Sequence, residues 1–394
     1  MTSIDYEQLK ADLDRYHLEG TTATVDHSWR QPSSAYCSAE RLAREQRRIF
    51  DRLPLVAARS SEVGQPDAFV SRSVVGTPLL LVRQADGTAR AFLNACRHRS
   101  VEVVADGQSG CSRRFTCPYH GWTYNGEGAL VGLPGRDAFD DLDPGDLGLA
   151  EVACAERHGL IFVARRPDVA IDLPTFLGPM DGVLSEVGLD TYVVERTIDL
   201  EVEANWKLVV DGFLETYHVR YLHGASLKDV LIPDRSAHDR LGPHGRLATP
   251  KLTYDPASHH RPDELYAQLS MNYRLFPNTM LTWFTDHFEM WQIEPDLTRP
   301  NRTTIRMSLL VRPEDLGRTR KWDTNATMSL DVITGEDFVA ATSTQRTLDG
   351  HAAPEWFVYG RNEPGVQHFH QSVLACLDDG VSSYSDATPN GEDR

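Results

Sequence analysis

The sequence predicts an α+β protein with two domains, a small all-β domain followed by a larger domain with an antiparallel sheet and long helices. The chain has 394 residues, which is enough for two or three domains of ordinary size. Between residues 67 and 165 the pattern is one of short β-rich runs, with a hairpin signal in "QADGTA". Beyond residue 190, longer alternating runs are interrupted by stretches with helical spacing.

The order of these patterns sets the expected domain boundaries. We expect a helical segment at 1–44 that packs on the larger domain, the β domain at 45–166, the larger domain at 167–379 and a flexible tail at 380–394. The run "SAERLAREQRRIF" offers a serine cap followed by helical spacing. The proline-containing "RRPDVAIDLPTFLGP" marks the passage between the domains, and the tail has the composition of a flexible segment.

The larger domain is expected to start with a strand in "TYVVERTIDLEVEA", because apolar and polar residues alternate there. The next run, "NWKLVVDGFLETYHVRYLHG", has the spacing of a buried helix. The runs "LSMNYRLFP", "TMLTWFTDHFEMWQIEP" and "RTTIRMSLLVRP" suit an antiparallel meander. Two helices, at roughly 324–348 and near 365–379, complete the predicted fold.

Composition excludes several classes of protein and partner. The net charge of −17 disfavours nucleic acid and anionic membranes as partners, and no apolar run approaches the ~20 residues of a membrane span. The N-terminus lacks the apolar core of a secretory signal, so we expect a cytoplasmic protein. Six scattered cysteines are too few for a disulfide scaffold, which leaves packing or metal ligation as their use.

Four of the potential metal ligands form a pattern. Cys96 and His98 make C-x-H, and after eighteen residues Cys117 and His120 make C-x-x-H. A zinc finger would pair its cysteines first and its histidines second, whereas here each loop supplies one of each. This arrangement fits a Rieske [2Fe–2S] cluster, in which one iron takes two thiolates and the other takes two imidazoles. Taken singly, each residue would be explained as a core cysteine or a surface histidine.

Neighbouring residues indicate which kind of Rieske module this is. Trp122 and Tyr124 are placed to shield a cluster from water. Respiratory Rieske proteins have an extra cysteine in each loop, but this chain has Tyr119 in the second loop, and Arg99 and Ser100 follow His98 in the first. The module therefore resembles the lower-potential oxygenase type. It departs from the usual C-x-H-R-G of that group, because Ser100 stands where glycine is common.

A second pattern lies in the predicted helix at 205–224. Glu215, His218 and His223 make E-x-x-H-x-x-x-x-H, with the first two on one helical face and the last beyond it, so the segment must bend or end there. The spacing alone is a weak metal signal, because helical histidines are usually surface residues. Together with the Rieske pattern, "NWK" and "ETYH" resemble the α subunit of Rieske non-haem iron oxygenases, the aromatic-ring-hydroxylating family, over most of the chain.

The resemblance implies a fold and a set of iron ligands. The larger domain would be a helix-grip (START-like) catalytic domain, in which His218, His223 and Asp337 hold a mononuclear Fe(II) as a 2-His-1-carboxylate triad. Asp337 matches the acid in the family's E-D-x-x-x-x-x-x-x-Q-R-x-L pattern, here "EDFVAATSTQRTL". Glu336 is the alternative ligand, and either acid could instead be an ordinary solvated charge.

The resemblance also implies roles for two further acids. Glu215 would link the iron site to a Rieske histidine of the neighbouring subunit, because the two centres of one chain are too far apart for fast electron transfer in this family. Most members have aspartate there, and glutamate resembles the members that oxidise carbons beside quaternary or tertiary amines. Asp211, one helical turn earlier, would share this bridge or hydrogen-bond to a ligand histidine.

The implied activity is that of a terminal oxygenase. It would add one or both atoms of O2 to a small organic, aromatic substrate, with electrons from NAD(P)H delivered by a separate reductase and in some systems a ferredoxin. The alternative is oxidative N-demethylation or hydroxylation of a quaternary or tertiary amine, and the alternative of another class is a Rieske electron-transfer protein without oxygenase activity. Inter-subunit transfer implies a homotrimer.

Candidate pocket residues follow from the aromatic content of the second domain. Asn205, Phe213, Trp283 and Trp291 are candidates for the substrate pocket, and core packing is the competing explanation for the aromatic ones. An aromatic lining suits a ring by stacking or an ammonium group by cation–π contact, so it does not discriminate between the two substrate classes.

Overall fold

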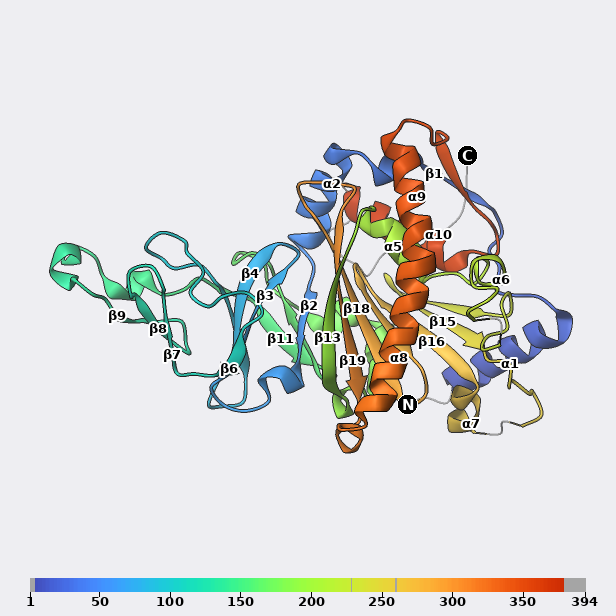
Figure 1. The fold of residues 1–394 in the computed structure, drawn as a ribbon, viewed down its shortest axis with the longest axis horizontal. Coiled ribbons are helices and arrows are strands. Elements are labelled where there is room, and N and C mark those ends of the chain that lie inside the picture. The colour runs from blue at the N-terminus through green and yellow to red at the C-terminus, as the bar shows by residue number, and fades with distance from the viewer. Residues whose placement is uncertain (1–3, 228, 259–260, 379–394) are drawn as a thin grey trace. The chain divides into compact units, whose positions relative to one another are not determined.

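The computed structural model describes residues 4–227, 229–258 and 261–378, so the predicted tail lies outside the described residues. The described residues form two compact units, one of 50–173 and 188–194 and the other of those within 4–49, 174–187 and 195–378. The predicted α+β class is confirmed, because the smaller unit is built of β-strands and the larger combines an antiparallel sheet with helices (Figure 1). The boundaries at residues 45 and 167 stay predictions.

The smaller unit consists of three antiparallel sheets. The largest has the order β10-β5-β4-β3-β6, and two three-stranded sheets have the orders β11-β12-β2 and β7-β8-β9. The strands run as follows: β2 Leu55–Arg59, β3 Ala68–Val74, β4 Thr77–Arg83, β5 Ala89–Leu93, β6 Ser109–Cys111, β7 Arg114–Thr116, β8 Thr123–Asn125, β9 Leu130–Gly132, β10 Glu151–Val152, β11 Cys154–Arg157 and β12 Leu160–Val163.

Two features of this unit position its loops. The predicted Asp-Gly hairpin joins β4 to β5, with Gly87 at φ 86°, a backbone conformation that glycine adopts without strain. The core reaches up to the two loops that carry the cysteines, because Cys96 and Cys117 are buried with Phe92, Phe115 and other apolar residues. The core of the smaller unit therefore holds both loops in place through their cysteines.

The larger unit contains one seven-stranded antiparallel sheet in the order β13-β19-β18-β17-β16-β15-β14, a meander from β14 to β19 with β13 at the far edge. Its strands run as follows: β13 Val193–Val202, β14 Ala237–Leu241, β15 His244–Pro250, β16 Leu269–Leu275, β17 Thr279–Trp283, β18 His287–Pro295 and β19 Thr303–Val311. The four runs predicted to form strands do so, and "TMLTWFTDHFEMWQIEP" forms two of them, β17 and β18. The β14–β15 hairpin was not predicted, although Gly242 supplies its turn at φ 65°.

Long helices cover one face of this sheet (Figure 1). Helix α8, Thr319–Val332, continues through a π-helical turn at Ile333–Asp337 into α9, Phe338–Asp349. This continuous run confirms the helical stretch predicted at roughly 324–348 and starts earlier, at Thr319. Its π-helical turn, which the sequence did not predict, ends at the predicted iron ligand Asp337, and π turns are frequent at functional sites. The last helix, α10, spans Pro364–Leu377.

The predicted helix at 205–224 is wrong, because the segment forms two short helices instead. Helix α5 spans Trp206–Gly212 and α6 spans Val219–Leu222, with an irregular turn between them. The Glu215 carboxylate accepts a hydrogen bond from the backbone N–H of His218 at 3.0 Å, which competes with helical hydrogen bonding there. Glu215 and His218 therefore meet across a turn rather than on a helical face.

The N-terminal segment packs on the rest of the larger unit through strand β1 and helices α1 and α2. Strand β1, Trp29–Pro32, pairs with β20, Trp356–Tyr359, and α1, Ile4–Glu19, lies beside β14. Helix α2, Ala39–Glu45, is tied to α5 by a buried ion pair, in which Lys207 Nζ lies 2.8 Å from Glu45 Oε2. This contact fixes the start of the segment that leads to the histidines.

Candidate metal centres

The first candidate centre lies in two loops of the smaller unit. One loop follows β5 and carries Cys96 and His98, and the other joins β7 to β8 and carries Cys117 and His120. In the first loop, the Ser100 N–H donates to Cys96 O at 2.8 Å and the Cys96 N–H donates to Val101 O at 2.9 Å. These two bonds fold the loop back on the cysteine.

The second loop repeats the turn of the first. The Gly121 N–H donates to Cys117 O at 3.1 Å, and the Cys117 N–H donates to Trp122 O at 2.8 Å. Gly121 has φ 74°, and Ser100, which occupies the same place in the first loop, has φ 58°. The serine noted in the sequence thus adopts a left-handed conformation that costs a non-glycine residue free energy.

The four side chains form two pairs, one of cysteines and one of histidines. Cys96 and Cys117 are each 3% exposed, and the Nδ1 atoms of His98 and His120 lie 3.1 Å apart. The His98 ring stacks on Trp122 with centroids 5.0 Å apart and planes 6° apart, so the indole shields one imidazole as expected. Two buried thiols and two facing imidazole nitrogens are the donor set of a cluster in which two thiolates hold one iron and two imidazoles hold the other.

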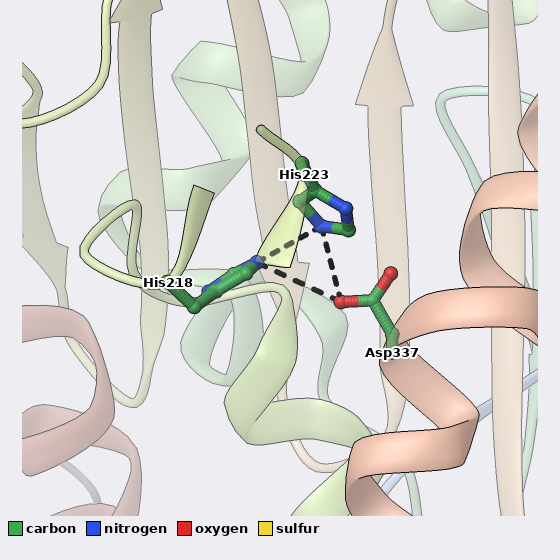
Figure 2. Close-up of side chains that lie close together, drawn as sticks. All are labelled: His218, His223 and Asp337. Carbon is green, nitrogen blue, oxygen red and sulfur yellow. Dashed lines mark hydrogen bonds and ion pairs between the residues drawn. The ribbon is translucent and has the colours of Figure 1, made fainter. Parts of the chain in front are cut away.

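The second candidate centre lies in the larger unit and joins residues far apart in the sequence (Figure 2). His218 Nε2 lies 3.2 Å from His223 Nε2, and Asp337 Oδ1 lies 3.6 Å from the first nitrogen and 3.3 Å from the second. His218 and His223 flank α6, and Asp337 ends the π-helical turn. Three ligand atoms that converge in this way can bind one face of a metal ion and leave the other face open.

The opposite edge of each imidazole is held by a carboxylate. His218 Nδ1 is hydrogen-bonded to Glu215 Oε1, and His223 Nδ1 lies 2.6 Å from Glu336 Oε2, which also accepts from Ser226 Oγ at 2.9 Å. Both carboxylates favour the tautomer that carries its proton on Nδ1. The lone pair of each Nε2 is then free to bind a metal ion. Glu336, the alternative ligand in the sequence, thus lies behind His223, whereas Asp337 lies among the ligand atoms.

The electrostatics of this site favour a positive charge. Burial lowers the pKa of His223, but the carboxylates of Asp337 and Glu336 raise it by more, so the net shift is upward. The hydrogen bond from His223 in turn lowers the pKa of Glu336. Three carboxylates around two imidazoles therefore form an anionic site, which suits a divalent metal ion.

Comparisons with known proteins identify the family of both domains. A model of the Rieske [2Fe-2S] domain matches residues 54–153, and a model of the ring hydroxylating alpha subunit (catalytic domain) matches residues 189–379. The chain belongs to the Rieske oxygenase α subunits. Its cofactors are a Rieske [2Fe–2S] cluster and a mononuclear iron, and the two donor sets described above fit these groups in kind and in number.

Individual relatives fall into two groups. The carnitine monooxygenase oxygenase subunit of Acinetobacter baumannii is 30% identical over 211 residues, which are 52% of this chain and 55% of the relative. The chlorobenzene dioxygenase subunit alpha of a Cupriavidus species is 33% identical over 180 residues, 44% of this chain and 40% of the relative. The chain thus spans about half the length of the curated relatives it matches.

The fold is shared with solved structures. A quaternary ammonium Rieske monooxygenase, whose structure bears on carnitine oxidation by gut microbiota and on inter-subunit electron transfer, superposes with a TM-score of 0.75. The alignment covers 89% of the α subunit described here and 96% of that chain, at 21% sequence identity.

Asp211 of this α subunit contacts residues that the sequence did not indicate. Its carboxylate accepts hydrogen bonds from Tyr36 Oη at 2.8 Å and from His370 Nε2 at 2.9 Å, and Tyr359 Oη lies 3.2 Å from the same nitrogen. These partners come from three segments. The prediction was instead that Asp211 would hydrogen-bond to a ligand histidine or share the electron bridge with Glu215. The observed network ties α5 to the N-terminal segment, β20 and α10.

The four pocket candidates of the α subunit separate in the structure. Phe213 and Trp291 pack together with ring centroids 5.7 Å apart. Asn205 caps α5, because its Oδ1 accepts from the Lys207 N–H at 3.1 Å. Trp283 packs on the neighbouring Phe288 with centroids 6.2 Å apart. The structure therefore brings two of the four together, and the other two contact different residues.

The fold of the α subunit shows one further general feature. Within the described ranges, no helix is both long and apolar enough to cross a membrane.

Proposed function

We propose that the chain is the terminal oxygenase of a Rieske system that hydroxylates a methyl or methylene carbon beside a quaternary or tertiary amine. The observation that carries this proposal is the convergence of His218 Nε2, His223 Nε2 and Asp337 Oδ1 within 3.2–3.6 Å of one another. A three-ligand face with open positions is the arrangement that non-haem iron oxygenases use. A pure electron carrier has no need of it.

The proposal assigns a role to each of these side chains. His218, His223 and Asp337 hold the mononuclear iron, and Cys96, His98, Cys117 and His120 hold the cluster. When bound, the two groups supply electrons one at a time and a site where O2 reacts, so that one oxygen atom enters a C–H bond and the other leaves as water. Glu215 and Glu336 keep each ligand histidine in the tautomer that presents Nε2.

Glu215 carries a second proposed role, as the bridge to the cluster of a neighbouring subunit. Its carboxylate already hydrogen-bonds to His218, and a hydrogen bond to a partner's cluster histidine would complete the connection. This role requires a ring of subunits, for which we propose a homotrimer. Electrons would come from NAD(P)H through a separate reductase, with or without a ferredoxin, which suits a cytoplasmic location.

Two observations favour an amine as the substrate. Glu215 is the glutamate that resembles amine-oxidising members, and the relative from Acinetobacter baumannii is a carnitine monooxygenase subunit. An aromatic ring is the second candidate, because a further relative is a chlorobenzene dioxygenase subunit and because Phe213 and Trp291 offer flat apolar surfaces.

Iron content and turnover test the proposal together. Protein loaded anaerobically should contain about three irons per chain, give a Rieske-type paramagnetic resonance when reduced, and consume O2 with a surrogate reductase. Carnitine, glycine betaine and γ-butyrobetaine should be turned over, whereas chlorobenzene and naphthalene should not. About two irons per chain and no turnover would instead identify an electron-transfer protein, and turnover of the aromatic compounds alone would select the second candidate.

A further inference from the structure

Gly212, the last residue of helix α5, borders the proposed iron site. A Cβ built on Gly212 would lie 3.9 Å from Asp337 Oδ1, the proposed ligand atom. Apart from its own helix and chain neighbours, it would meet no other atom of the described residues within 4 Å. That distance is an ordinary van der Waals contact, so a Cβ would fit here without a clash. The glycine therefore leaves a space beside the ligand atom.

The backbone does not require a glycine at this position. Gly212 is not among the glycines with positive φ, and the next residue, Phe213, has the right-handed φ −84° and ψ −9°. Glycine is less favourable than alanine in a helix, because it loses more conformational freedom on folding. Neither backbone strain nor close packing explains the glycine, which leaves the space itself as its reason.

The space is open to molecules from solution. The side chains of His218 and Asp337 are 22% and 21% exposed, and Gly212 is itself partly exposed. A small molecule can therefore reach both the ligand atoms and the surface at Gly212. This access is what a substrate that reacts beside the metal site requires.

Contacts on both sides hold Gly212 in place. The carboxylate of the preceding Asp211 accepts a hydrogen bond from His370 Nε2 at 2.9 Å, and the ring of the following Phe213 packs on Trp291 with centroids 5.7 Å apart. Helix α5 also packs against β18 and α9. These contacts resist a shift of the backbone, so a side chain added at Gly212 would occupy the space rather than move away from it.

We infer that Gly212 is a specificity-determining residue, whose missing side chain leaves room for the alkylated ammonium end of the substrate beside the iron ligands. The inference rests on the proposed amine oxidation and adds the residue that sets how bulky this end can be. A trimethylammonium group is about as wide as it is long, whereas a dimethylammonium group is smaller by one methyl. The space at Gly212 should therefore matter most for trimethylated substrates.

Side chains of increasing size at Gly212 test the inference. Gly212→Ala in the full, cofactor-loaded chain should bind glycine betaine at least roughly 5-fold more weakly, and Gly212→Val at least roughly 30-fold, because the added groups overlap the substrate. N,N-dimethylglycine, which lacks one methyl, should lose less affinity, so the ratio of the two affinities should change by about 5-fold or more. Anaerobic calorimetry measures the binding of both compounds.

Two controls separate a role in binding from a structural one. Gly182 lies in helix α4, Pro179–Val187, where an added Cβ would meet no atom of the described residues within 4 Å. Gly182→Val should therefore leave both affinities unchanged. Gly212→Ala should retain about three irons per chain, and it should not lower the midpoint of thermal unfolding, because alanine suits a helical backbone.

The outcomes distinguish the inference from the function on which it rests. If the wild-type protein oxidises amines and both Gly212 variants bind glycine betaine as tightly as wild type, the inference is wrong and the function stands. Equal losses for the two compounds, or loss of iron or thermal stability in Gly212→Ala, would also overturn the inference. If the wild-type protein oxidises no amine, the function fails and the inferred role fails with it.

Discussion

The two candidate metal centres are assembled from the chain in opposite ways. The cluster residues lie between 96 and 120, in two loops whose turns are closed by the same pair of backbone hydrogen bonds. The triad spans 218 to 337 and joins a pair of histidines beside α6 to an acid at the end of a π-helical turn. The first centre depends on local turn geometry, and the second depends on the packing of the larger unit.

This difference predicts how each centre responds to damage. A substitution in a cluster loop changes one turn, and its effect should stay within the smaller unit. The triad histidines are instead held by carboxylates from two segments, Glu215 in the preceding turn and Glu336 in the π-helical turn. Loss of one such contact should therefore weaken the iron site without affecting the cluster.

The largest expected effect is the loss of the proposed ligand Asp337. Asp337→Ala removes one of three ligand atoms, so the mononuclear iron should be lost and turnover should fall at least ~10³-fold, more than the 10–100-fold typical of a residue behind a ligand. Cluster absorbance and paramagnetic resonance should be unchanged, with about two irons left per chain.

Asp331→Ala provides the matched control, because this exposed acid lies nearby on α8. It should retain about three irons and full turnover. An Asp337→Ala protein that keeps its third iron would show that another residue completes the site.

The next effect concerns the carboxylate behind His223. Glu336→Gln keeps the size of the side chain but removes its charge, so iron affinity should fall by roughly 10–100-fold. Iron titration of the apoprotein measures this, with the cluster already in place. Ser226→Ala, which removes only one hydrogen bond to Glu336, should have a smaller effect. Equal affinity in wild type and Glu336→Gln would leave His223 oriented by its backbone alone.

The same contrast explains what could be predicted from the sequence. The cluster loops were predictable because their ligands are close in sequence and alternate in a way that one cluster type requires. The strands of the sheet were predictable from alternation, apart from the β14–β15 hairpin. Asp337 could be assigned only through a family pattern, since no spacing relates it to His218 and His223.

Long-range contacts account for what the sequence did not reveal. The turn that breaks the expected helix forms because Glu215 hydrogen-bonds to the backbone of His218, a competition that apolar spacing cannot show. The partners of Asp211 come from residues 36, 359 and 370, which only the fold brings together. Each of these contacts joins polar groups, and apolar periodicity does not reveal such pairings.

The smallest expected effect returns to the cluster loops. Ser100→Gly should raise the free energy of unfolding of the cluster-loaded protein by about 1 kcal/mol, because the serine adopts φ 58° where Gly121 in the matching loop has φ 74°. Ser109→Gly, in strand β6, should instead lower stability by roughly 0.5–1 kcal/mol. Denaturant unfolding followed by cluster absorbance compares the two. If Ser100→Gly destabilises the protein, the serine side chain supports its loop by more than the strain costs, and the two loops are equivalent in backbone only.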